Sequence, residues 1–160
     1  MSITRCLTVQ LASLALSLAC TAGPVFAQSA HVLVPADKVQ WGPAPPARAE
    51  IAVLEGNPSE KGSVTLRLRF PANYNIPAHW HSMTERVTVL SGAFHVGMGD
   101  TLDRHASRTL EPGGFVSLPA TMRHFAWTAT PTVVQINLEG PFDIFYVNPA
   151  DNPQKPLTKR

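Results

Sequence analysis

The stretch PAHWHSMTERVTVLSG, residues 77–92, places two histidines and one glutamate just before an alternating apolar segment. His79 and His81 are two residues apart, so in an extended strand both side chains point to the same face. Glu85 lies four residues further on and shares that face if the chain stays extended. Two imidazoles and a carboxylate form a donor set that suits a first-row transition metal. The stretch therefore predicts a metal site built on β-structure.

His124 is the fourth candidate ligand, because it begins another strand-like segment, residues 124–128, after a turn at Pro119. A neighbouring strand would bring His124 opposite the first three ligands. Four ligands leave one or two positions open on an octahedral ion, and a catalytic site needs such open positions. We expect one divalent transition metal per subunit, and Fe, Mn, Ni, Cu and Zn all suit these donors.

Short strand-like segments separated by turn residues surround this stretch. In residues 63–70, Val64, Leu66 and Leu68 alternate with polar residues, which indicates a strand with one buried and one wet face. Ser91-Gly92 predicts a two-residue hairpin between residues 86–90 and 93–98. Further strands are expected at residues 51–54, 115–118, 124–128, 132–138 and 142–147. This pattern predicts an all-β fold, a single antiparallel barrel or sandwich.

Composition narrows the classes of protein to consider. The chain has 160 residues, which suits one ordinary domain, and only 15% are charged, against a typical figure of about 25%. The formal net charge is +2 and lysines and arginines do not cluster, so we expect no nucleic-acid partner. There is no run of 18 apolar residues, which excludes a protein with several transmembrane helices.

Residues 1–27 have the pattern of a secretory signal peptide: Arg5, a short apolar stretch, and small residues in a Val25-Phe26-Ala27 cleavage site. Cys20 raises the alternative of a lipoprotein, although Ser17 stands where leucine is favoured in a lipid-attachment signal. Both cysteines, Cys6 and Cys20, leave with the signal peptide, so the mature chain has no thiol nucleophile and no disulfide. We expect a periplasmic or secreted protein that is not bound to a membrane after cleavage.

The mature chain divides into three parts. Residues 28–48 are expected to form an extended, proline-rich N-terminal arm, because the prolines of residues 41–46 exclude a helix, and Trp41 is expected to pin it to the core. Residues 49–148 form the expected β-barrel domain. Residues 149–160 contain few apolar groups and are expected to be a flexible C-terminal tail.

Two motifs in this chain resemble those of the cupin family. The first is His79-x-His81, three residues, Glu85, six residues and Gly92; its leading glycine is missing, and Asn73 or Tyr74 stands nearby. The second is Gly113, five residues, Pro119-x-Thr121, two residues, His124, three residues and Thr128. Thr121 replaces the motif's second glycine and Thr128 replaces its asparagine. The resemblance covers about residues 50–147.

The resemblance implies a jelly-roll β-barrel with a metal inside, held by His79, His81, Glu85 and His124. The cupin family includes dioxygenases, decarboxylases and isomerases, so the resemblance does not select a reaction. We therefore keep three hypotheses for the function. The first is a metal-dependent enzyme, an oxidoreductase, lyase or isomerase, that acts on a small molecule. The second is a non-catalytic binder or sensor of a metal or small ligand, and the third is a structural or storage protein.

The remaining polar residues add little to this choice. Gln135, Asn137, Tyr74 and Tyr146 are candidate contacts to a substrate, but none is a strong base, which favours redox or Lewis-acid chemistry over proton abstraction. Gln135 and Asn137 are expected to face solvent, His95 to point outward, and Trp80 to lie on the face opposite the ligands. We also expect a homodimer, because barrels of this kind can pair their edge strands.

Overall fold

The computed structural model describes residues 31–44 and 48–153. The predicted signal peptide, the Cys20 alternative and the end of the predicted tail therefore lie outside the described residues. All elements named below belong to one compact unit, Val32–Arg160. Within the described part of the chain, no helix has the length and apolar character needed to cross a bilayer.

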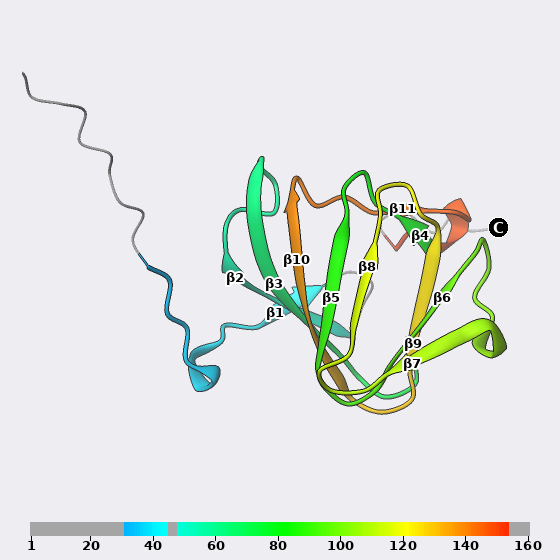
Figure 1. Cartoon of the computed structure of the whole chain (residues 1–160), viewed down its shortest axis with the longest axis horizontal. Helices are drawn as coiled ribbons and strands as arrows, with labels where there is room; N and C mark the ends of the chain where they lie inside the picture. The colour runs from blue at the N-terminus through cyan, green and yellow to red at the C-terminus, as the bar shows by residue number, and fades with distance from the viewer. Residues whose placement is uncertain (1–30, 45–47, 154–160) are drawn as a thin grey trace, which may run out of the picture. The chain divides into compact units, whose positions relative to one another are not determined.

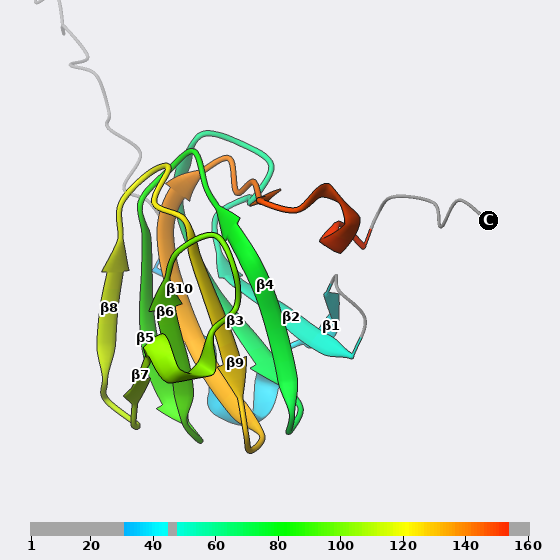
Figure 2. The same ribbon diagram turned by 90° about the vertical axis from the view of Figure 1, so that its right-hand side faces the viewer.

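The fold consists of two antiparallel β-sheets that face each other (Figures 1 and 2). The six-stranded sheet has the strand order β1 (Gly42–Ala44), β2 (Ala49–Glu55), β3 (Gly62–Phe70), β10 (Thr132–Gly140), β5 (Glu85–Ser91), β8 (Phe115–Leu118). The five-stranded sheet has the order β11 (Phe145–Tyr146), β4 (Tyr74–Trp80), β9 (His124–Thr128), β6 (Phe94–Met98), β7 (Ser107–Leu110). Three single-turn 3₁₀ helices, η1 (Ala36–Lys38), η2 (Arg104–Ala106) and η3 (Pro149–Asp151), complete the described structure. The predicted all-β fold is confirmed.

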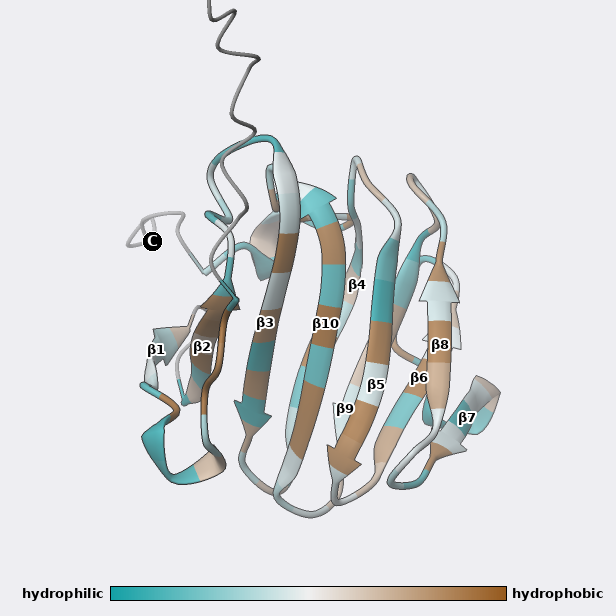
Figure 3. Ribbon diagram, turned by 60° about the vertical axis from the view of Figure 1, so that its left-hand side comes forward, coloured by the Kyte–Doolittle hydropathy of each residue, from teal (hydrophilic) through white to brown (hydrophobic). Residues whose placement is uncertain are grey.

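The alternation seen in the sequence places the core between the sheets (Figure 3). Leu66 and Ile136 pair across β3 and β10, and both are buried. On the outer face of the same strands, Arg67 donates a hydrogen bond to Gln135 at 3.2 Å, and Asn137 donates one to Thr65 at 2.9 Å. Gln135 and Asn137 thus lie on the outer face, as predicted.

The predicted hairpin at Ser91-Gly92 is wrong. β5 pairs with β10 and β8 in one sheet, whereas β6 pairs with β9 and β7 in the other. The chain crosses between the sheets at Gly92, whose φ is +75°. A Cβ atom there would lie 2.3 Å from the carbonyl oxygen of Pro131, so glycine is required for the close approach and not for a two-residue turn.

Three strands were not predicted: β1, β4 and β7. β4 contains Pro77, which has no N–H to donate, and its pairing with β9 shifts between Ile76 and His79. The strand expected at residues 142–147 is shorter, because only Phe145 and Tyr146 pair with β4. In the predicted arm, β1 pairs with β2, and the Arg69 guanidinium lies 4.4 Å from the centre of the Trp41 ring.

Candidate metal centre

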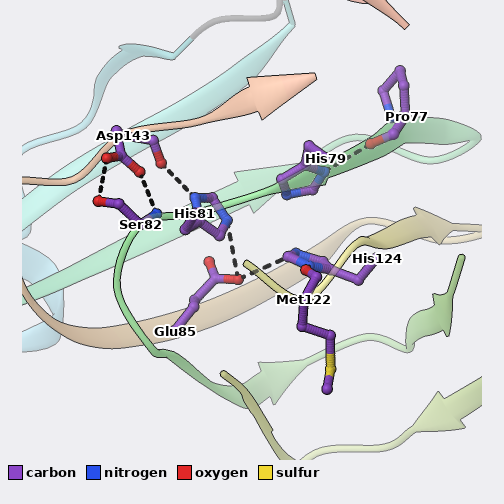
Figure 4. Close-up of polar contacts among 8 residues, drawn as sticks. All are labelled: Pro77, His79, His81, Ser82, Glu85, Met122, His124 and Asp143. Carbon is purple, nitrogen blue, oxygen red and sulfur yellow. Dashed lines mark hydrogen bonds and ion pairs between the residues drawn. The ribbon is translucent and has the colours of Figure 1, made fainter. Parts of the chain in front are cut away.

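Three of the four predicted ligands meet between the two sheets (Figure 4). His79 in β4 and His124 in β9 are directly opposite in the strand pairing, and their ring centroids are 4.2 Å apart. His81 follows the end of β4, with its ring centroid 5.0 Å from that of His79. One ring nitrogen from each histidine lies within 4.8 Å of the others, and all three residues are buried. These three histidines could hold a metal ion.

Backbone carbonyls fix the orientation of all three imidazoles. His79 Nδ1 lies 2.7 Å from the carbonyl oxygen of Pro77, and His124 Nδ1 lies 2.9 Å from that of Met122. His81 Nδ1 is hydrogen-bonded to the carbonyl oxygen of Asp143. A neutral imidazole that donates through Nδ1 presents an unprotonated Nε2, which is the tautomer that binds a metal. His81 Nε2 is buried without a hydrogen-bond partner among the described residues, which fits a nitrogen that binds a metal ion.

Glu85 also lies beside the histidines, but it comes from a different strand from the one predicted. The chain does not stay extended after His81: residues 81–84 leave the five-stranded sheet, and Glu85 opens β5 in the six-stranded sheet. The Glu85 carboxylate still lies 3.5 Å from His81 Nε2 and 3.6 Å from His124 Nε2. The structure therefore brings all four predicted residues together: His79 from β4, His124 from β9, Glu85 from β5, and His81 from the loop that follows β4.

The four residues of the site differ in how their surroundings shift their pKa values. Burial and the neighbouring His124 lower the pKa of His79 to about 3, so His79 is neutral at physiological pH. Burial disfavours an ionised Glu85, but the neighbouring imidazoles of His124 and His81 outweigh it and lower the pKa of the carboxyl group. Burial also opposes a charge on His81, yet Glu85 and Asp143 together raise the pKa of His81. A carboxylate is thus held ionised beside a neutral His79, whereas His81 must release its proton before it can bind a cation.

Residues 141–147, which we call the strap, run along the end of β4 and contact the ligands. The backbone N–H of Phe142 donates to the Pro58 carbonyl at 2.7 Å, and that of Val147 donates to the Ala78 carbonyl at 2.9 Å. The Asp143 carboxylate accepts hydrogen bonds from Ser82, one from the backbone N–H at 2.8 Å and one from the hydroxyl group. Asp143 therefore binds both sides of the loop that carries His81, through its carbonyl and through its carboxylate.

The histidines and Glu85 form one part of the wall of a cavity of about 280 Å³. Most of the rest of the wall is hydrocarbon from both sheets and the strap: Ile51, Leu68, Phe70, Ile76, Val87, Phe94, Val134, Ile136, Phe142 and Ile144. Among the described residues, no lysine or arginine lines this cavity. The arrangement joins a polar end, where three histidines could hold a metal ion, to an apolar chamber.

The sequence did not place Asp143 in the site, and it offered no position for Tyr146. Both line the cavity, and Tyr146 pairs with His79 across β11 and β4, with their ring centroids 6.1 Å apart. Their position depends on the strap returning to β4 from more than 60 residues away, as the pairing of residues 80 and 145 shows. The short turn Gly140-Pro141 was the available signal that the chain changes direction there.

The other polar candidates lie away from the site. His95 stacks on Trp127 on the outer face, with centroids 3.7 Å apart, which confirms its outward direction. Tyr74 is buried and stacks on Phe70, and burial raises its pKa to about 12. Trp80 stacks on Phe145, 4.3 Å between centroids, away from the histidines on either side of it.

Two residues at or near glycine positions of the cupin motifs have the left-handed backbone conformation that glycine adopts most readily. Thr121, which stands in place of glycine, has a φ of +65°, and Asn73, near the missing leading glycine, has a φ of +55°. Asparagine tolerates this left-handed region, whereas a β-branched residue is strained there. The N–H of Thr121 donates to the His81 carbonyl at 2.8 Å, so this turn is tied to the loop that carries the ligands.

Two facing antiparallel sheets with a histidine cluster between them are the arrangement that the resemblance to cupins implies. The ChrR cupin-like domain family matches residues 29–135, which is more than half of the chain, and the chain belongs to this family. No curated protein matches the sequence significantly.

Solved structures share the fold at low sequence identity. A putative acetylacetone dioxygenase from Methylibium petroleiphilum PM1 is 20% identical with a TM-score of 0.60, and the match covers 82% of this chain and 90% of that one. The polyketide cyclase RemF from Streptomyces resistomycificus is 15% identical with a TM-score of 0.59, covering 80% and 90%. KdgF from Halomonas sp. is 19% identical with a TM-score of 0.55, covering 66% and 92%.

Proposed function

We propose that the chain is a metal-dependent enzyme, of the oxygenase, decarboxylase or isomerase class, that acts on a small and largely apolar molecule. The observation that carries this proposal is the junction of three buried imidazoles and a carboxylate with an apolar cavity. Several proteins of similar structure carry enzyme names, among them the putative dioxygenase and the cyclase. Likeness at this level of identity supports the fold, so the chemistry must come from the site itself.

In this proposal, His79, His81 and His124 hold one divalent ion through Nε2, and Glu85 binds it through a carboxylate oxygen. The bound ion would supply Lewis-acid or one-electron redox chemistry. The chain's own residues have three tasks. The carbonyl partners of Nδ1 fix the imidazole tautomers. The ionised Glu85 reduces the charge of the centre, and the apolar wall excludes bulk water.

A dedicated general base is not supported by the residues that line the cavity. The Asp143 carboxylate is engaged by the N–H and hydroxyl of Ser82. Tyr146 is a phenol, and burial raises its pKa, so it remains protonated at neutral pH. These groups can bind and orient a substrate, which agrees with redox or Lewis-acid chemistry and not with proton abstraction by a side chain.

The first test is elemental analysis of the mature chain, residues 28–160, purified without a metal-affinity tag, beside the double variant His79→Ala/His81→Ala. One equivalent of iron or manganese in the wild type alone supports the enzyme, and justifies a substrate screen with and without O₂. Zinc alone would favour a hydrolytic, isomerase or structural role. If no metal binds under any loading condition, the enzyme is rejected and the barrel is a module for binding small ligands.

We also propose that the protein is exported and forms a homodimer. Export is supported by the signal pattern of residues 1–27 and by the lack of cysteine after residue 20. Dimerisation is supported by Phe115, which is 55% exposed on β8, the end strand of the six-stranded sheet. Cell fractionation tests the first proposal, and light scattering of the purified protein tests the second.

A further inference from the structure

The cavity beside the histidines extends across five neighbouring strands of the six-stranded sheet. On this sheet its lining residues come from β1, β2, β3, β10 and β5, which lie side by side (Figure 3). Glu85, in β5, marks the end at the histidines. Ala44 in β1 and Ala49 in β2, which pair with each other, line the cavity at the other side of this stretch of sheet.

The pairing of the strands gives the length of the cavity along the sheet. Ile51 in β2 pairs with Leu68 in β3, and Leu68 pairs with Val134 in β10. Val134 pairs in turn with Val89 in β5, which lies four residues after Glu85. Three strand spacings separate β2 from β5. At about 3.4 Å per residue and about 4.8 Å per strand, Glu85 and Ile51 are therefore about 20 Å apart along the sheet.

The cavity is narrow, and its polar groups are confined to one end. Ala49 lies still further from Glu85 than Ile51 does, because β2 runs antiparallel to β5. A volume of about 280 Å³ spread over such a length forms a channel and not a round chamber. Among the described residues, every lining side chain from β1, β2, β3 and β10 is hydrocarbon. The polar ones, Asp143 and Tyr146 included, belong to β5, β9, the strap, and β4 with the loop that follows it.

From this geometry we propose that the substrate is an elongated, unbranched apolar chain that carries its reacting group at one end. The reacting end lies at the histidines, and the tail runs between the sheets toward Ala44 and Ala49. These two alanines determine specificity, because their small side chains leave the far end of the channel free for the tail. The inference rests on the proposed function for the reacting end, and it goes further in naming the shape of the substrate and the residues that select its length.

The test uses Co²⁺ as a spectroscopic ion in the chain expressed at full length, with neutral 1-alkylimidazoles from butyl to decyl as probes. The free imidazole nitrogen binds the ion and shifts the cobalt absorption bands, so only the length of the alkyl chain varies. In the wild type, each added CH₂ group should raise the affinity about fourfold, because the channel removes it from water.

Ala49→Leu fills the far end of the channel alone. It should weaken the decyl compound about tenfold or more and leave the butyl compound within about twofold of the wild type. Ala44→Leu, at the paired position, is the second variant if Ala49→Leu does not fold. Ala129→Leu is the matched control, because Ala129 is exposed between β9 and β10 and does not line the cavity. It should bind the whole series as the wild type does.

The inference is overturned if the affinity does not depend on chain length while the cobalt bands shift. It is also overturned if Ala49→Leu or Ala44→Leu weakens the butyl and decyl compounds by the same factor. If the wild type binds no cobalt, or if no alkylimidazole shifts its bands, the proposed function is rejected instead. Calorimetry of the same series with the metal-free chain then tests the tail alone: a length dependence that Ala49→Leu removes supports the channel, and its absence overturns it.

Discussion

His79 and His124 lie directly opposite each other in the pairing of β4 with β9, and each donates its Nδ1 hydrogen to a carbonyl two residues before it in its own chain segment. The same hydrogen bond to a nearby backbone carbonyl therefore orients the Nε2 atoms of both histidines, which lie on adjacent strands, toward one point. His81 depends instead on a distant carbonyl, that of Asp143. The orientation of His79 and His124 thus depends on nearby residues, and that of His81 depends on the strap. A mutation in the strap should therefore affect His81 more than the other two histidines.

His124→Ala should reduce metal affinity by about 100-fold or more, since losing even an outer partner of a ligand costs about 10–100-fold. Glu85→Ala should also lower occupancy sharply. Elemental analysis after dialysis measures both effects, and circular dichroism checks that the barrel remains folded. His95→Ala is the control, because His95 lies on the outer face against Trp127. Full occupancy in His124→Ala or Glu85→Ala would refute the ligand assignment.

Asp143→Ala should lower metal affinity by about tenfold, because it frees the strap from Ser82 and loosens the carbonyl that orients His81. Competition with a chromogenic chelator gives the affinity. Asp100→Ala removes a carboxylate that pairs with Arg123 at the surface, 2.9 Å away, and should leave it unchanged. Equal affinities for these two variants would show that the strap does not organise the site.

Metal affinity should rise with pH from the acidic range to above pH 6.5, the ordinary pKa of histidine. A metal binds neutral imidazole, and the raised pKa of His81 means that this ring must release its proton, whereas His79 is already neutral. Below the pKa of His81 the affinity should increase about tenfold for each pH unit, and then flatten. Chelator competition between pH 5.5 and 8 follows this change. A flat profile over that range would contradict the direction given for His81.

Thr121→Gly should stabilise the fold by about 0.5–1 kcal/mol. The left-handed conformation costs a residue with a side chain about 1–2 kcal/mol, and the greater freedom of glycine in the unfolded chain offsets part of the gain. Chemical denaturation measures the free energy of unfolding. Thr88→Gly, within β5, should instead destabilise by about 0.5–1 kcal/mol. Destabilisation by Thr121→Gly would show that the threonine side chain compensates for the strain.

Gly97→Ala should destabilise the barrel by about 1–3 kcal/mol through overpacking. A Cβ atom at Gly97 would lie 2.2 Å from the ring of Phe125, which pairs with it across β6 and β9. Gly42→Ala in β1 meets nothing within 4 Å and should change the free energy of unfolding by less than about 0.5 kcal/mol. Thermal melts of the two variants, side by side, make the comparison, and equal melting temperatures would be inconsistent with this packing.

The strands in which apolar and polar residues alternate strictly could be predicted from the sequence, because this alternation identifies the buried face of a strand. Residues 63–70 and 132–138 became the centre of the six-stranded sheet, and His124 was correctly placed opposite His79. β4 was missed because Pro77 interrupts its pattern, and pairing with β9 outweighs that local preference. The prediction of a hairpin at Ser91-Gly92 was wrong. Gly92 is required because it lies close to the backbone carbonyl of Pro131, and in the sequence such a glycine looks the same as one required by a turn.

The histidine motif was sufficient to bring the ligands together but not to describe their surroundings. Asp143 and Tyr146 enter the site only because the strap returns to β4, and no local pattern encodes that contact. The apolar wall likewise comes from strands that each look like ordinary core. Spacing within one segment can be read from the sequence, whereas contacts between distant segments need the fold.

The division of the proposed ligands between the two sheets would link metal binding to the separation of the sheets. Glu85 belongs to the six-stranded sheet, while His79 and His124 belong to the five-stranded sheet. An ion bound by residues of both sheets would cross-link the sheets. Any movement of the sheets apart would then lengthen the bonds between the ion and these side chains. Local opening of the barrel and release of the ion would then occur together. A bound ion should therefore slow amide hydrogen exchange in β4, β5 and β9 to a similar extent.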